Sequence, residues 1–135
     1  MSNLVLFDTS VFVDHLRTGC HERRIASLTG LLRTSSVVLA ELWRGATKPA
    51  EREFLRALEK NHRLLTPTEA NWLESGRILG KICVDKGFSA DKLRELHFDV
   101  LIALTARSHG ARLITSDRAD FELIRGYRKF DVEIW

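Results

Sequence analysis

The chain has 135 residues, of which 44% are hydrophobic and 29% charged, and its formal net charge is +3. This length suits one domain, and the composition is that of a globular protein rather than a disordered chain. The longest apolar run, Val100 to Leu104, is far shorter than the roughly 20 residues of a membrane helix, and no signal peptide is expected. Two cysteines without a CxxC spacing favour a reducing, cytoplasmic location.

The first half of the chain alternates predicted strands and helices. Leu4 to Phe7 is a short apolar run typical of a buried strand, and Asp8 can cap a following helix that extends through Leu16. Apolar residues at helical spacing predict a second helix near 22–32. We then expect a strand over Thr34 to Val38, helices over Leu39 to Ala46 and 49–60, and a weak strand over Arg63 to Leu65.

The second half continues this alternation. Thr66, Pro67 and Glu69 match a helix start, with Thr at the cap, and the helix extends to Lys86 with Gly87 beyond it. We then expect a helix over His97 to His109, a strand over Arg112 to Thr115, a short helix near 119–125 and a strand over Val132 to Trp135. This pattern predicts an α/β fold with one domain over residues 1–135, in which helices flank a central parallel sheet of four or five strands.

Four acidic residues fall at the edge of this sheet where ligands bind in α/β proteins, beyond the carboxyl ends of the strands. Asp8 and Asp117 each follow a predicted strand directly, and Glu41 lies at the start of the helix after the second strand. Asp99 lies in the first turn of an apolar predicted helix. Each acid alone could be a helix cap, a first-turn acid, a surface residue or a turn residue. Because all four meet at one predicted edge, we expect their carboxylates to converge.

Converging carboxylates repel one another strongly unless a cation lies between them. Mg²⁺ prefers oxygen ligands and suits one or two direct carboxylates, whereas no cluster of His or Cys favours zinc. Asp120 could assist a second metal beside Asp117, although a helix start also explains it. Asp14 is expected to face elsewhere or the solvent. The sequence therefore predicts a divalent-metal centre.

Four segments resemble, in order, the motifs of PIN-domain ribonucleases. They are Phe7 to Asp14 (FDTSVFVD), Ala40 to Gly45 (AELWRG), Asp99 to Ala106 (DVLIALTA) and Leu113 to Phe121 (LITSDRADF). One such motif is a weak signal, but four at the expected separations cover nearly the whole chain. The short, single-domain length is similar to that of the VapC toxins of bacterial VapBC toxin–antitoxin modules.

The resemblance implies an endoribonuclease that depends on Mg²⁺ or Mn²⁺. It assigns the metal and the catalysis to Asp8, Glu41, Asp99 and Asp117, with the first and third as the direct ligands. The metal would activate a water that attacks the RNA phosphodiester, and an acid that does not bind the metal directly would orient that water. The resemblance also implies a homodimer, a heterotetramer or larger assembly with a VapB-type antitoxin, and an antitoxin tail across the active-site groove.

Further side chains are predicted to support this function. Ser10 and Ser116 would stand behind the metal ligands. An apolar groove for the antitoxin would be lined by Phe12, Leu16, Leu42 and Trp43, the last of which could instead belong to the core. Phosphate contacts are expected from Arg17, Arg23, Arg24, Arg44, Lys48, Arg112 and Arg118, each of which could equally be a solvated surface residue.

Two alternatives remain open from the sequence. One is a non-catalytic RNA- or protein-binding module of the same fold. The other is a metal-dependent phosphatase of the haloacid-dehalogenase type, although Ser10 stands where that chemistry needs a second Asp. No Ser–His–Asp arrangement is expected, because the five histidines share no spacing.

Overall fold

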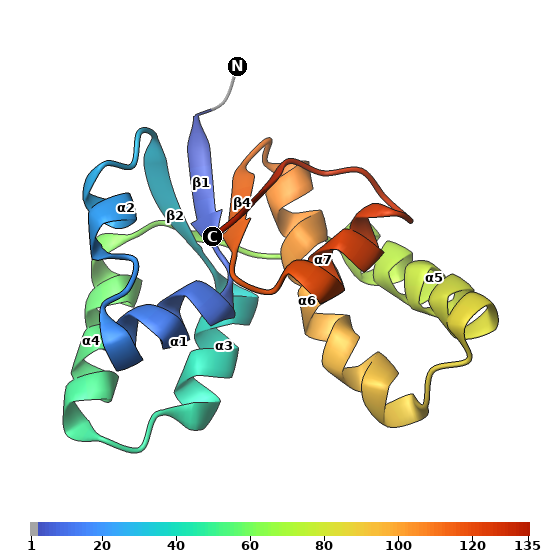
Figure 1. The fold of residues 1–135 in the computed structure, drawn as a ribbon, viewed down its shortest axis with the longest axis horizontal. Coiled ribbons are helices and arrows are strands. Elements are labelled where there is room, and N and C mark those ends of the chain that lie inside the picture. Colours follow the sequence, from blue (N-terminus) through green and yellow to red (C-terminus); the bar gives the residue numbers. More distant parts are fainter. Residues whose placement is uncertain (1–2) are drawn as a thin grey trace.

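The computed structural model describes residues 3–135, and residues 1 and 2 of the predicted domain lie outside it. Its centre is a five-stranded sheet with strand order β3-β2-β1-β4-β5, in which all neighbouring strands are parallel (Figure 1). The strands are β1 (Leu4–Phe7), β2 (Leu31–Ser35), β3 (Leu64–Leu65), β4 (Arg112–Thr115) and β5 (Val132–Ile134). The predicted α/β class and parallel sheet are therefore confirmed.

Helices flank the sheet on both sides. In Figure 1, the helices of the N-terminal half gather on the left and those of the C-terminal half on the right. They are α1 (Thr9–Thr18), α2 (Glu22–Ala26), α3 (Ser36–Gly45), α4 (Pro49–Asn61), α5 (Glu69–Lys86), α6 (Ala90–Ser108) and α7 (Arg118–Arg125). Across residues 3–135, no helix combines the length and the apolar character that crossing a membrane requires.

The strand order determines which chain segments meet at the carboxyl edge of the sheet. Strand β1 lies between β2 and β4, and its ladder continues past its end, where the Asp8 N–H donates to the Ile114 carbonyl (2.8 Å). The central strands are buried on both faces, with Leu6, Leu113 and Ile114 fully enclosed. The residues that follow β1 and β4 consequently emerge side by side.

The predicted strand over Thr34 to Val38 is wrong, because α3 already begins at Ser36. The Ser35 hydroxyl caps this helix by accepting from the N–H groups of Val37 (3.1 Å) and Val38 (3.3 Å). The apolar run that suggested a strand is instead the buried stripe of α3, which starts earlier than the predicted Leu39. Glu41 therefore lies in the second turn of this helix, not at its start.

The predicted helix over 22–32 is also too long, since α2 ends at Ala26 and β2 begins at Leu31. Gly30 between them has φ +119°, and a Cβ at this position would meet the carbonyl oxygen of Asn3. Only glycine adopts this backbone conformation readily, so the helical pattern cannot continue through it. The first residue of β2, Leu31, is 51% exposed, which shows that its apolar character does not reflect the core.

Two further helix starts differ from the prediction. Helix α6 begins at Ala90 rather than His97, capped by the Ser89 hydroxyl, so Asp99 lies in the middle of the helix. Helix α5 is capped by Thr68 rather than Thr66, through a reciprocal pair of 3.0 Å hydrogen bonds with Asn71. The other predicted elements agree with the structure to within two residues at each end.

Candidate metal centre

Asp8 is a buried carboxylate with one satisfied and one unsatisfied oxygen. It caps α1 and is 3% exposed. Its Oδ2 accepts from the hydroxyls of Ser10 (2.7 Å) and Thr115 (2.8 Å), whereas its buried Oδ1 has no partner among the described residues. Burial raises the pKa of Asp8, and the hydrogen bonds from Ser10 and Thr115 oppose that rise. A buried carboxylate oxygen without a donor is a natural ligand for a cation.

Glu41 reaches the same edge from α3. Its Oε1 accepts a 2.9 Å hydrogen bond from the Thr9 hydroxyl, which fixes the carboxylate against the start of α1. Burial raises the pKa of Glu41, the hydrogen bond from Thr9 lowers it, and the charges of Asp8 and Arg44 act in opposite directions. Glu41 is therefore an acid held in place by a neutral donor beside Asp8.

Asp99 is the acid most affected by its neighbours. Burial, followed by the charges of Asp8, Asp120, Glu41 and Asp117, raises its pKa to about 9. No described residue donates a hydrogen bond to its side chain. Without a cation, Asp99 consequently holds a proton at neutral pH, and a bound cation would favour its ionised form.

Asp117 and Asp120 complete the arrangement from the turn that begins α7. The Asp117 Oδ1 accepts from the Asp120 N–H (3.2 Å), and its own N–H donates to the Thr115 hydroxyl (2.9 Å). Burial is the largest cause that raises the pKa of Asp117. Ligand oxygens of Asp99, Asp117 and Asp120 all lie within 4.8 Å of one another, which makes Asp120 a member of the cluster.

We call these five carboxylates the acid centre. Its members are Asp8, Glu41, Asp99, Asp117 and Asp120. The structure thus brings the four predicted site residues together, since each of the other three acts electrostatically on Asp99. It also adds Asp120, for which the sequence left open a role beside Asp117 at a second metal or at the start of a helix. Only carboxylate oxygens are offered, and this donor set fits a hard divalent cation such as Mg²⁺.

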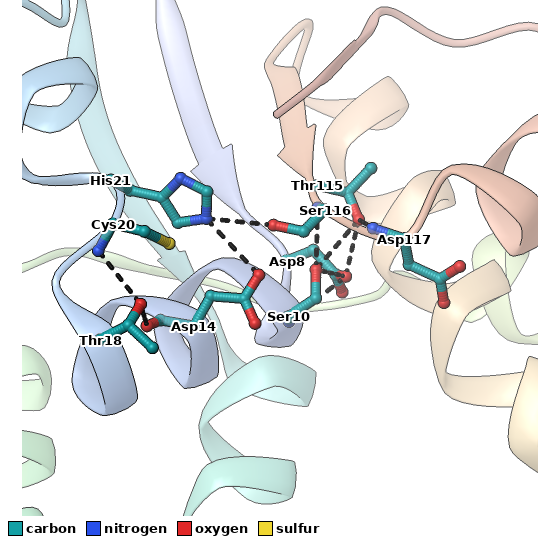
Figure 2. Close-up of polar contacts among 9 residues, drawn as sticks. All are labelled: Asp8, Ser10, Asp14, Thr18, Cys20, His21, Thr115, Ser116 and Asp117. Atoms are coloured by element: carbon teal, nitrogen blue, oxygen red, sulfur yellow. Dashed lines mark hydrogen bonds and ion pairs between the residues drawn. The ribbon is translucent and has the colours of Figure 1, made fainter.

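Hydroxyl groups behind the acids form a layer that the sequence only partly revealed. Ser10 donates to Asp8 and accepts from the backbone N–H of Ser116 (3.0 Å), so the serine predicted behind the ligands occupies that place (Figure 2). Thr115 links Asp8 to the Asp117 backbone, and Thr9 orients Glu41. A threonine that ends a buried strand two residues before an acid was the available signal for Thr115.

A serine, a histidine and an aspartate do meet beside the acid centre, contrary to the expectation from spacing. The buried His21 places Nε2 3.2 Å from the Ser116 Oγ and 3.5 Å from the Asp14 Oδ2 (Figure 2). Both partners contact the same ring nitrogen, whereas a catalytic triad places the acid and the nucleophile on opposite nitrogens. The group therefore ties the β4–α7 turn to α1 and does not activate a nucleophile.

An apolar groove opens beside Glu41. It has a volume of about 280 Å³, and its apolar lining comes from Val13, Leu16, Leu42, Ala46 and Leu55. Thr9, Glu41 and Arg17 also line it. Two of the predicted groove residues, Leu16 and Leu42, are therefore part of this surface.

The other two predicted groove residues lie elsewhere. Phe12 is buried against the rings of Phe7 and Phe54, so it belongs to the core. Trp43 is partly buried, and its indole N–H donates to Glu59. Core packing and a surface hydrogen bond thus account for both aromatic residues.

The arginines predicted to contact phosphate lie in different parts of the structure. The Arg44 guanidinium lies 5.6 Å from the centre of the Phe98 ring, and Phe98 directly precedes Asp99 in the chain. Arg17 lines the apolar groove. Arg118 and Arg112 instead pair with Glu122 (2.8 Å) and Glu133 (3.6 Å), and Arg24 lies over the Trp135 ring (5.7 Å). Contact between these side chains and a phosphate stays a prediction.

The sheet order and the acid centre at its carboxyl edge define the class of this protein. The chain belongs to the PIN-domain family, whose model matches residues 5–127. Members of this family are generally nucleases. The predicted resemblance to PIN domains is thereby confirmed.

The chain is also similar to solved toxin–antitoxin structures. They include DNA-bound VapBC from Salmonella typhimurium (22% identity, 100% of this chain and 99% of that chain, TM-score 0.70). VapBC-1 from nontypeable Haemophilus influenzae is 20% identical over 98% of both chains, with a TM-score of 0.70. VapBC2 from Rickettsia felis, bound to a promoter fragment, is 19% identical over 98% of both chains, with a TM-score of 0.70. These likenesses establish the fold. No curated protein sequence matches the chain.

Proposed function

We propose that the protein is a divalent-metal-dependent endoribonuclease that hydrolyses RNA phosphodiester bonds. The observation that carries this proposal is the position of the half-buried Asp99, whose pKa is raised to about 9 by desolvation and by the charges of four other carboxylates. Such an arrangement is unfavourable by itself, and strongly perturbed acids are concentrated at functional sites. Membership of a family of nucleases supports the reaction class.

The donor set supports Mg²⁺ as the cofactor, with Mn²⁺ as an alternative of similar ligand preference. The residues that would hold the ion are Asp8, Glu41, Asp99 and Asp117, and Asp8 offers an unpartnered buried oxygen. When bound, a divalent ion lowers the pKa of a ligated water and offsets charge on the reacting phosphate.

The chain's own residues have separate tasks in this reaction. Ser10 and Thr115 hold one oxygen of Asp8, so that its other oxygen points at a fixed place. Asp99 would be ionised in the presence of a bound cation, because the positive charge favours the carboxylate over the acid. Glu41, whose pKa is raised and whose carboxylate is held by Thr9, is suited to accept a proton from the attacking water.

We propose further that the protein is the toxin of a type II toxin–antitoxin system and acts in the cytoplasm as a homodimer. A VapB-type antitoxin would assemble with it into a heterotetramer or larger complex. The apolar groove supports this proposal, because a peptide seated there would pass Glu41 and could cover the acid centre. Co-expression with the product of a neighbouring small reading frame should yield a stable complex, and Leu16→Arg, at an exposed position of the groove, should prevent it.

The decisive experiment measures cleavage of cellular RNA in Mg²⁺ by the wild type, Asp8→Asn and Asp99→Asn. Loss of a metal ligand should lower the cleavage rate by at least about 100-fold. Asp91→Asn is the matched control, because Asp91 is an exposed acid on the same helix as Asp99 and pairs with Arg94. Wild-type cleavage by a folded Asp99→Asn variant would contradict the proposal.

Two other outcomes would favour the alternative functions. A wild-type protein that binds no divalent ion near neutral pH, yet binds RNA or protein, would be a non-catalytic module. Hydrolysis of phosphate monoesters without RNA cleavage would indicate a phosphatase. The contact between Ser10 and Asp8 argues against the latter, because the hydroxyl occupies the place of the second acid that phosphatase chemistry needs.

A further inference from the structure

Lys92 is the basic side chain in direct contact with the acid centre. Its Nζ lies 3.2 Å from the Asp120 Oδ1, and within residues 3–135 no other Lys or Arg comes within 4.0 Å of these five carboxylates. Arg44 acts on Glu41 at longer range without pairing with it. One side of the acid centre therefore has a cation of its own, and the other side has none.

The helical geometry explains this placement. Lys92 and Asp99 are seven residues apart on α6, which is close to two turns, so both lie on the same face of the helix. Asp120 in the first turn of α7 lies beside Asp99 and also reaches Lys92. The side chains of Lys92 and Asp120 are 36% and 21% exposed, so the ion pair is partly shielded from solvent.

The two sides of the acid centre differ in whether a positive charge already balances their carboxylates. At the Asp8 side, a buried oxygen has no donor and no cation. At the Asp120 side, the ammonium of Lys92 already balances one carboxylate. A divalent ion at Asp120 would lie next to this ammonium and be repelled by it, whereas an ion at Asp8 would meet only negative charge.

We propose that Lys92 takes the place of a second divalent ion, so that the acid centre binds one metal on the Asp8–Asp99 side and none at Asp120. The relevance of this arrangement to RNA cleavage rests on the proposed function, but the metal count does not. A compact ammonium is a point charge well suited to this role, and near a bound phosphate it would stabilise developing negative charge.

The test counts bound Mn²⁺ by the decrease of the free-ion electron paramagnetic resonance signal at pH 7.5. The wild type should bind one ion per chain, and Lys92→Gln should bind two, because the repelling charge is gone. Arg94→Gln is the matched control, since it removes a positive charge from the same helix at an exposed position that pairs with Asp91. Two ions in the wild type, or one in Lys92→Gln, would overturn the inference.

A second pair of variants locates the single ion. Asp120→Asn should still bind one Mn²⁺ with wild-type affinity, whereas Asp8→Asn should bind it at least about tenfold more weakly. If Asp120→Asn loses the ion and Asp8→Asn keeps it, the metal lies on the Lys92 side and the inference is wrong. Circular dichroism confirms that each variant is folded before the ions are counted.

RNA cleavage gives the third readout. At a Mg²⁺ concentration that fills one site of the wild type, Lys92→Gln should cleave RNA about 10- to 100-fold more slowly, and Lys92→Arg should restore most of that rate. Full activity of Lys92→Gln under this condition would contradict the stabilising role of the ammonium. A wild type that binds one ion but cleaves no RNA would overturn the proposed function and leave the metal count intact.

Discussion

Asp8 and Asp99 are acids at one edge of the sheet, the first buried and the second half-buried, and their surroundings differ in kind. Asp8 accepts hydrogen bonds from two hydroxyls that belong to α1 and β4, whereas Asp99 receives none and is surrounded by other carboxylates. Hydrogen bonds therefore fix the position of the Asp8 carboxylate, whereas repulsion from neighbouring carboxylates acts most strongly on Asp99. A metal ion would bind the fixed carboxylate of Asp8 and would reduce the repulsion at Asp99, so the two acids contribute different properties to one site.

Combining substitutions at the two acids should give the largest effect on activity. Asp8→Asn and Asp99→Asn should each lower RNA cleavage at least about 100-fold, and the double variant should lose little more than either single one. The physical reason is that both variants remove the same bound ion. Single-turnover cleavage in Mg²⁺ measures all three, and a double variant that loses the product of the two single effects would mean that the acids act independently.

The hydroxyl support of Asp8 is tested by Thr115→Val, which keeps the shape of the side chain. The change leaves the Asp8 Oδ2 and the Asp117 N–H each without one partner, so the free energy of unfolding should fall by about 1–3 kcal/mol. Cleavage should fall about 10- to 100-fold. Chemical denaturation and RNA cleavage assays measure the two effects.

Thr105→Val is the matched control for this substitution. Thr105 is equally buried, but its hydroxyl donates to the Leu101 carbonyl within α6 and does not contact the acid centre. This variant should keep near wild-type cleavage. Equal losses of activity in both variants would mean that general destabilisation, and not the hold on Asp8, explains the effect of Thr115→Val.

The electrostatic stress at Asp99 should appear as a pH dependence of stability in the metal-free protein. Asp99 keeps a proton up to about pH 9 when folded, but loses it near the ordinary value of 3.8 when unfolded. Between these values the folded state binds more protons, so a rise in pH lowers the free energy of unfolding. The melting temperature in EDTA should therefore fall between pH 6 and pH 9.

Asp99→Asn should flatten this dependence, because the amide does not titrate and does not repel its neighbours. At pH 8 the metal-free variant should melt several degrees above the wild type. Added Mg²⁺ should raise the melting temperature of the wild type more at pH 8 than at pH 6, since metal binding releases the proton. An equal slope in the wild type and in Asp99→Asn would show that Asp99 is not the stressed group.

The contact of His21 with the β4–α7 turn should matter least. His21→Ala removes the links to Ser116 and Asp14 and leaves a buried gap, so the free energy of unfolding should fall by about 1–3 kcal/mol. Cleavage should change only a few-fold, because a group that holds a turn does not touch the reacting atoms. A loss as large as that of Asp8→Asn would make His21 part of the chemistry.

The sequence predicted the sheet because the central strands are buried on both faces. Leu4 to Phe7 is a short apolar run and Arg112 to Thr115 has an apolar centre, Leu113 and Ile114; both segments are strands in the structure. The run Val37 to Leu39 looks the same in sequence, but the Ser35 hydroxyl caps it into a helix. A short apolar run alone does not distinguish a buried strand from the buried stripe of a helix.

Asp8 and Asp117 could be placed at this edge because each directly follows a strand, but the helix positions of Glu41 and Asp99 and the environment of all the acids could not be predicted. Asp99 was expected in a first turn because the first half of α6 is mostly polar, with Leu93 and Leu96 as its only large apolar residues before Phe98. Its position in the middle of the helix places it two turns beyond Lys92. The roles of Thr9 and Thr115 depend on contacts between segments far apart in the chain, such as the 107 residues between Thr115 and Asp8, and the local sequence indicates only that Thr115 ends a strand before an acid.

Strand β4 lies in the sheet between β1 and β5, although it comes late in the chain. Three of the five carboxylates likewise come from residues 99, 117 and 120. While the ribosome is still producing the chain, the nascent polypeptide lacks the strand that flanks β1 and the acids that accompany it. If the protein cleaves RNA as proposed, a growing chain would lack a complete acid centre, and activity would begin only after residues 99, 117 and 120 have been added and folded.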